Sequence, residues 1–196
     1  MGQITKSKNI SIKKELLNKY SNISQLLEDE ACFNNYDDEI IIKNNLKEIE
    51  NVKYNLLTST EAYHLALKIF QKYNNFNNFN KFNNNGYEII VSNGDIKESV
   101  NKIYYNKKQR NLLKEHLLIF SNLGNVIERA ILVCQTTERK NRENNAVWSY
   151  YLIGLKINKK KYIFEFDVVS RDNNENHYRV QRLKEIKKQT SQLETL

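Results

Sequence analysis

A short basic loop beside an aromatic strand is the part of this sequence whose residue types best suit contact with a polyanion. The loop spans residues 138–145 (ERKNRENN) and carries three cations, Arg139, Lys140 and Arg142. Such cations either hold a phosphate or are simply solvated in an exposed loop. Trp148 and Tyr150 follow on one face of a predicted strand. Their rings are suited to stacking on bases, and core packing is the alternative.

Two histidines, His116 and His177, are of a residue type that could act as an acid or a base. His116 falls on the apolar stripe of a predicted helix, which favours a hydrogen-bonded core histidine over a catalytic base. His177 lies near a turn, two residues before Arg179, where a solvated surface role is the simpler interpretation. Lys159 and Lys160 belong to a predicted hairpin tip that is either solvated or extends a groove along a nucleic-acid backbone.

Several kinds of chemistry have no motif in this sequence. There is no HExxH, CxxC or GxSxG, and five scattered glycines build no phosphate-binding loop. We therefore expect no metal and no cofactor. Cys32 and Cys134 lie far apart, and no apolar run approaches the ~18 residues of a membrane-spanning helix. These observations favour a soluble cytoplasmic protein that does not contact a membrane.

The element that must position these residues is a predicted β-hairpin over 147–169. Apolar and aromatic side chains alternate with period two on both sides of the polar turn Asn158-Lys159-Lys160. No other segment carries as much β-forming apolar surface, so we expect this hairpin at the centre of the sheet.

Helical spacing predicts most of the elements before the hairpin. Thr58 and Glu61 have the spacing of a capping box, and Gly124 is placed to end a helix. The predicted helices are 11–30, 37–50, 58–73, one capped by Ser92, and 107–123; the predicted further strands are 87–91, 131–136 and 177–183.

The predicted fold class is α+β, with a helical N-terminal region followed by helices packed on a small antiparallel β-meander. The boundaries are a helical region over 1–73, an Asn-rich linker over 74–85 and a basic α+β domain over 86–196. The linker phenylalanines Phe76, Phe79 and Phe82 either tether this segment to a core or stack on bases.

Positive charge is concentrated in the second part of the chain. The net charge of the 196 residues is +8, and residues 86–196 hold 20 basic and 13 acidic side chains, a balance of +7. A field of this sign is typical of polyanion binding, although lysines that only solubilise the surface would give the same count.

The order of segments in the second part resembles a known group of domains. The segments are DIKES (95–99), LLKEHLLIFSNLGNVIERA (112–130), ERKNRENN, and WSYYLIGLKINKKKYIFEFDV (148–168). Over about residues 87–183, this order resembles the phage and mobile-element domains called large polyvalent protein-associated domains. Several of those are assigned to the barnase–EndoU–colicin–RelE group of RNases and toxins.

That resemblance implies an antiparallel sheet that cradles RNA and cleaves it without a metal. A base would take the 2′-hydroxyl proton, an acid would protonate the leaving oxygen, and cations would stabilise the transition state. The candidates for these roles are His116, Lys140 and His177 for catalysis, and Arg139, Arg142, Trp148, Tyr150, Lys159, Lys160 and Arg179 for RNA contact. No matched acid–base pair stands out in the sequence.

Three functions remain open on the sequence. The first is an RNA-interacting phage or mobile-element protein, with metal-independent RNase or toxin chemistry in a bacterial cytoplasm. The second is a non-catalytic counter-defence inhibitor, like an anti-CRISPR protein, that binds a nucleic-acid-guided effector, with the N-terminal helices available to a protein partner. The third is a scaffold module with no affinity for nucleic acid even at low salt.

Overall fold

The computed structural model describes residues 40–42, 46–74, 79–136, 146–170 and 175–186. The strands are β1 (Ile40–Ile42), β2 (Phe79–Asn84), β3 (Tyr87–Ser92), β4 (Ile131–Thr136), β5 (Val147–Ile157), β6 (Lys160–Ser170) and β7 (Asn176–Ile186). The helices are α4 (Ser59–Tyr73), α5 (Asn93–Tyr105), α6 (Lys107–Arg110), α7 (Leu113–Phe120) and α8 (Leu123–Arg129), with 3-10 turns η1 (Lys47–Ile49) and η2 (Tyr54–Leu56).

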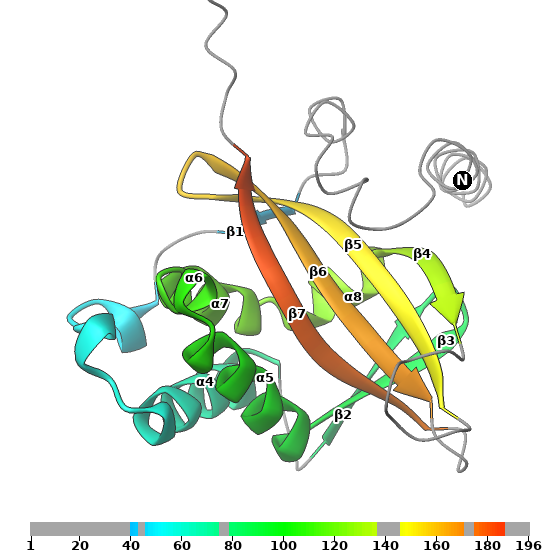
Figure 1. Ribbon diagram of the computed structural model, residues 1–196, viewed down its shortest axis with the longest axis horizontal. Helices are drawn as coiled ribbons and strands as arrows, with labels where there is room; N and C mark the ends of the chain where they lie inside the picture. Colours follow the sequence, from blue (N-terminus) through cyan, green and yellow to red (C-terminus); the bar gives the residue numbers. More distant parts are fainter. Residues whose placement is uncertain (1–39, 43–45, 75–78, 137–145, 171–174, 187–196) are drawn as a thin grey trace, which may run out of the picture.

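The strands form one curled, mixed sheet rather than a small antiparallel meander. Its order is β1-β5-β6-β7-β3-β2, with β4 paired to β5 as a seventh strand. Two pairings are parallel, β1 with β5 and β3 with β7. Figure 1 shows α4, α5, α6 and α7 together on one side of the long strands. The predicted fold class is therefore wrong: the architecture is mixed α/β, and residues 1–39, to which most of the predicted helical N-terminal region belongs, lie outside the described residues.

The predicted hairpin is confirmed as the longest antiparallel pair. β5 and β6 remain in register from Val147 opposite Ser170 to Ile157 opposite Lys160. Asn158 and Lys159 close it with φ of 52° and 68°, the left-handed conformations that a two-residue hairpin turn requires. On the face toward the helices, Tyr151 stacks on Phe166 with ring centroids 5.1 Å apart, at the centre of the main core.

Two predicted helices differ in the structure. The helix expected over 37–50 is wrong, because Ile40–Ile42 pairs with β5 and alternates as a strand does: Ile40 and Ile42 are buried, and Ile41 is 68% exposed. The helix expected over 107–123 is divided into α6 and α7. The predicted capping box of Thr58 with Glu61 is present on α4. Ser92 caps α5 as predicted, and the structure adds Asp95 as its capping-box partner.

Gly124 lies in the first turn of α8 and does not terminate a helix. A Cβ at this position would lie 2.7 Å from Cε1 of Phe82, closer than carbon atoms approach without displacement. Phe82, on β2, packs against the main core. This agrees with the alternative in which the ring tethers its segment to a core. Glycine at 124 therefore permits a close approach of α8 to β2.

Asparagine side chains join the segment after α4 to neighbouring helices. Nδ2 of Asn74 donates to the carbonyl oxygens of Phe70 and Phe120, and its Oδ1 accepts from the backbone N–H of Gly124. Nδ2 of the buried Asn84 donates to the carbonyls of Ile127 and Ala130. These bonds supply side-chain donors to carbonyl groups at or just beyond helix ends, where backbone partners are fewest. The carbonyls of Phe70 and Ile127 also accept from the backbone N–H groups of Asn74 and Ala130.

Side chains from α5 and α6 bond the edge of β7 that does not face β6. Beyond a single pairing of His177 with Ile90 of β3, the N–H of Val180 donates to Ser99 Oγ at 3.2 Å. Gln109 of α6 accepts from the N–H of Leu183 at 2.7 Å and donates to the carbonyl of the same residue at 3.1 Å. Gln109 thus takes the place of a neighbouring strand and fixes α6 against β7.

Candidate nucleic-acid interface

A cluster of ionisable side chains forms where the beginning of β7 meets α5. Strand periodicity places His177 and Arg179 on the same face of β7. The α5 cap places Asp95 beside them, because Oδ2 of Asp95 accepts from the backbone N–H and the hydroxyl of Ser92 at 2.8 and 2.7 Å. We call Asp95, Glu98, Glu175, His177 and Arg179 the His177 cluster.

Within this cluster the imidazole is held between two carboxylates. Nδ1 of His177 lies 3.2 Å from Oδ2 of Asp95, and Nε2 lies 3.4 Å from Oε2 of Glu175. The His177 side chain is 23% exposed, so the ring is reachable from solvent. With a carboxylate beside each ring nitrogen, either nitrogen can carry the hydrogen, and a partly exposed imidazole held in this way is suited to act as a general acid or base.

Arg179 is fixed from two sides. Its Nη1 lies 3.0 Å from Oε1 of Glu98, and its guanidinium carbon lies 5.6 Å from the ring centroid of Trp148. Its Nε is buried, with no hydrogen-bond partner among the described residues. A cation held this way two residues from an oriented histidine is suited to a phosphate oxygen, and the geometry combines the two groups that the sequence had named separately.

His116 lies in the core, 1% exposed, far from any route for a substrate. Its Nε2 is 2.9 Å from Oε1 of Gln109, and burial lowers its pKa to about 3. The structure thus places His116 as the hydrogen-bonded core histidine that the sequence offered as the alternative, and does not bring it to the His177 cluster. The other catalytic candidate, Lys140, lies outside the described residues, as do Arg139 and Arg142.

The aromatic candidates, Trp148 and Tyr150, pack against neighbouring side chains instead of projecting into solvent. Trp148 is buried in a small cluster with Ala146 and Val169, and the partly buried Tyr150 packs against it. Core packing is the alternative that the sequence had kept open for both rings. The part of Trp148 that bears on the site is its contact with Arg179.

The hairpin tip gathers lysines. Lys159 and Lys160 are exposed there, and Lys156 lies opposite Lys161 on the same two strands. Lys160 pairs with Glu185 at 3.0 Å. The tip is thus a basic end of the sheet, at the opposite end of β6 and β7 from the His177 cluster.

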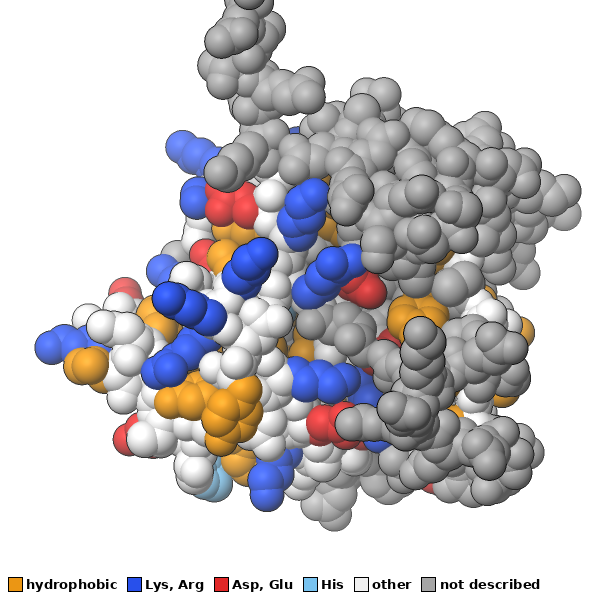
Figure 2. All heavy atoms as spheres, in the orientation of Figure 1, with side chains coloured by type: hydrophobic (Ala, Val, Ile, Leu, Met, Phe, Trp, Pro, Cys, Tyr) orange, Lys and Arg blue, Asp and Glu red, His pale blue; other side chains and the backbone are white. Residues whose placement is uncertain are grey.

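A second group of cations was not anticipated from the sequence. The docking of Gln109 on Leu183 brings the residues that flank each of them together. Figure 2 shows Lys and Arg side chains gathered over α5, α6 and β7 on the face toward the viewer. We call the cations that flank Gln109 on α6 and Leu183 on β7 the basic face: Lys107, Lys108, Arg110, Arg182 and Lys184. The feature of the sequence that could have indicated this face is Gln109. It is a polar residue one helical turn before Leu113, in line with the His116 stripe, and it has cations on both sides.

Among the residues that the structure describes, no group of three or more His, Cys, Asp or Glu side chains could hold a metal ion. In the same part of the chain, no helix combines the length and the apolar character that crossing a membrane would need.

In comparisons with known proteins, no family model, no curated protein and no solved structure matches this chain.

Proposed function

We propose that this chain is an RNA-interacting protein of phage or mobile-element character that acts in a bacterial cytoplasm and grips RNA through its basic face. The observation that carries the proposal is the junction of Gln109 with Leu183. It joins two cation-rich segments, 107–110 and 182–184, that are more than seventy residues apart in the sequence. A row of cations held on rigid elements is suited to tracking a phosphate backbone.

The charges beside the basic face support an anionic ligand. Arg182 is paired with the carboxylate of Glu165 on the neighbouring strand. The α6 side of the basic face consists of Lys107, Lys108 and Arg110. Three phosphate contacts to a single strand, from Lys107, Lys108 and Arg110, would give a slope of log K against log salt of about −2.1, at roughly −0.7 per contact.

The test is fluorescence anisotropy of a labelled single-stranded RNA at several salt concentrations. The double variant Lys107→Gln with Lys108→Gln should weaken binding and make the slope shallower by about 1.4, because two phosphate contacts are lost. A double variant of Lys68→Gln with Lys81→Gln makes the same change in net charge on α4 and β2, away from the basic face, and should keep the slope. No binding of RNA at low salt would refute the proposal and favour a scaffold role.

A second candidate function, metal-independent RNA cleavage, is supported by the His177 cluster. In this reaction the 2′-oxygen attacks phosphorus after losing its proton to a base, and the 5′-oxygen leaves after receiving a proton from an acid. His177 would serve as one of these two groups, positioned by Asp95, and Arg179 would stabilise charge on the phosphate.

Cleavage is tested on the same RNA in EDTA between pH 5 and 9. If the chain cleaves, His177→Gln should abolish product while leaving RNA affinity unchanged, and His64→Gln, an exposed histidine on α4, should have no effect. Binding without product from the unmodified chain would exclude cleavage and favour the alternative of a non-catalytic counter-defence inhibitor.

A further inference from the structure

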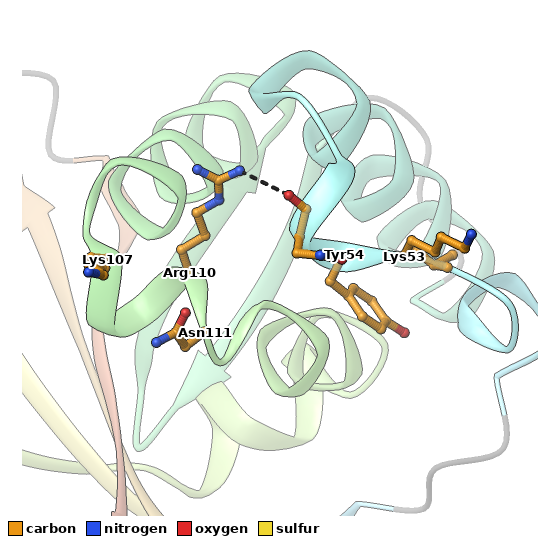
Figure 3. A pocket seen from close by; sticks show the side chains of 7 residues that line it. Lys53, Tyr54, Lys107, Arg110 and Asn111 are labelled. Carbon is orange, nitrogen blue, oxygen red and sulfur yellow. Dashed lines mark hydrogen bonds between the residues drawn. The ribbon is translucent and has the colours of Figure 1, made fainter.

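A groove of about 670 Å³ lies between η2 and α6. Val52, Lys53, Tyr54 and Asn55 line one side, and Lys107, Arg110 and Asn111 line the other. Figure 3 shows Arg110 reaching from α6 toward η2, with Lys107 and Lys53 on opposite sides of it. The volume is in the range that accommodates a small organic ligand such as a nucleotide.

The lining of the groove selects for negative charge. It includes three cations, Lys53, Lys107 and Arg110, and no aspartate or glutamate. The remaining polar lining is the amides of Asn55 and Asn111 and the hydroxyl-bearing Tyr54, whose O–H donates to the carbonyl of Ile49. An anion in this groove would therefore meet three cations in its lining; the charge of Glu115 acts on Tyr54, but Glu115 does not line the groove.

Arg110 is oriented before any ligand arrives. Its guanidinium carbon lies 4.2 Å from the ring centroid of Tyr104, and its Nη2 donates to the carbonyl of Asn55 at 3.4 Å. A guanidinium has five N–H donors, and among the described residues this long bond to Asn55 is the one hydrogen bond it makes. The planar fork thus retains donors for two phosphate oxygens, in an orientation set by the Tyr104 ring.

An exposed aromatic ring continues the site. Tyr105 is 77% exposed, and its ring meets that of Tyr104 edge to face, with centroids 5.4 Å apart. Arg110, Tyr104 and Tyr105 therefore form a continuous path from the groove to the surface. A cationic groove beside a solvent-exposed ring is the combination that single-strand-binding proteins use, with phosphates on the cations and a base on the ring.

We infer that this groove binds one unpaired nucleotide of a single-stranded RNA, its phosphate on Arg110, Lys53 and Lys107 and its base stacked on Tyr105. The inference deepens the proposed RNA binding and rests on it, because it names single strands as the ligand class. A base inside a duplex is stacked between its neighbours and cannot lie on Tyr105, so double-stranded RNA binds more weakly.

The first experiment compares single-stranded and double-stranded RNA of the same sequence by anisotropy. Tyr105→Ser should weaken single-strand binding about tenfold and leave duplex binding unchanged, as expected for one lost stacking contact. Arg110→Gln should weaken single-strand binding to a similar degree. The matched controls are Tyr87→Ser, another exposed tyrosine, and Lys68→Gln, an exposed cation on α4; both should bind as the unmodified chain does.

A second measurement observes the groove directly. Titration with AMP, followed by amide NMR, should shift the backbone signals of Asn55 and Asn111, and adenosine without phosphate should not. If RNA binds the unmodified chain and Tyr105→Ser binds equally well, the groove inference is refuted while the proposed function stands, because Tyr105 is not part of the basic face. If RNA does not bind but AMP shifts these two amides, the proposed function fails and the groove remains a nucleotide site; if neither binds, both are refuted.

Discussion

His116 makes the stability of the fold depend on pH below about 6.5. The ring is buried against Phe164, with centroids 6.2 Å apart. Oε1 of Gln109 already accepts from the N–H of Leu183, so Nε2 of His116 must carry the hydrogen that points to the same oxygen. A second proton on this ring would place a charge in the core, and desolvation therefore lowers its pKa from 6.5 to about 3.

The sign of the effect follows from where the proton binds. Below pH 6.5 the unfolded chain takes up a proton at His116 and the folded chain does not, so acid favours unfolding. The loss begins near the unfolded pKa of 6.5 and continues until the folded pKa of about 3 is passed. With these two values the free energy of unfolding falls by about 2 kcal/mol between pH 7 and pH 5.

Urea unfolding at pH 7, 6 and 5 measures this loss, with the fluorescence of Trp148, the single tryptophan and a buried one, as the signal. His116→Gln keeps an N–H donor near Gln109 but cannot take up a proton, so its stability should fall by about 2 kcal/mol less over the same range. His64→Gln, on the exposed side of α4, should keep the full dependence. Equal losses for the unmodified chain and His116→Gln would show that His116 is not buried as a neutral ring.

The remaining predictions concern side chains that join elements, and each is measured by urea unfolding at pH 7. Gln109→Leu should cost roughly 2–6 kcal/mol, because the N–H and the carbonyl of Leu183 each lose a buried partner worth about 1–3 kcal/mol. Gly124→Ala should cost about 1–3 kcal/mol, since Phe82 must move away from the new methyl group, and a cost near zero would mean that β2 yields freely. Asn84→Ala should cost about 1–3 kcal/mol by removing the buried side-chain donor to the carbonyls of Ile127 and Ala130, while the exposed Asn125→Ala should stay within about 0.5 kcal/mol of the unmodified chain.

The features that the sequence predicted correctly are those set by neighbouring residues. The period of two and the polar turn gave the β5–β6 hairpin, and the spacing of Thr58 with Glu61 and the predicted cap at Ser92 gave two helix starts. The isoleucines of β1 were assigned to a helix because acidic residues precede them, whereas pairing with β5 decides their conformation. Pairing between distant segments leaves no local pattern, and so the mixed sheet was missed.

In the candidate site, too, the sequence indicated single residues but not the contacts between distant segments. His177 and Arg179 were named for their residue types, as a candidate catalytic group and a candidate RNA contact, but Asp95, which contacts His177, precedes it by 82 residues. The groove depends on the packing of η2 against α6, and no motif joins residues 52–55 with 107–111. The asparagines near β2 were interpreted as linker composition, although Asn74 and Asn84 bond helix ends. The sequence alone does not distinguish an asparagine that makes tertiary hydrogen bonds from one that lies in a solvated loop.

The bonds from Ser99 and Gln109 to β7 have a consequence for self-association. Between Val180 and Leu183 this edge is protected by side chains of two helices and not by another strand. If α5 and α6 separate from it, the strand presents unpaired N–H and carbonyl groups of the kind that recruit a strand from another molecule. Variants that weaken the Gln109 contact should therefore become prone to aggregation as protein concentration rises, even under conditions in which most molecules remain folded.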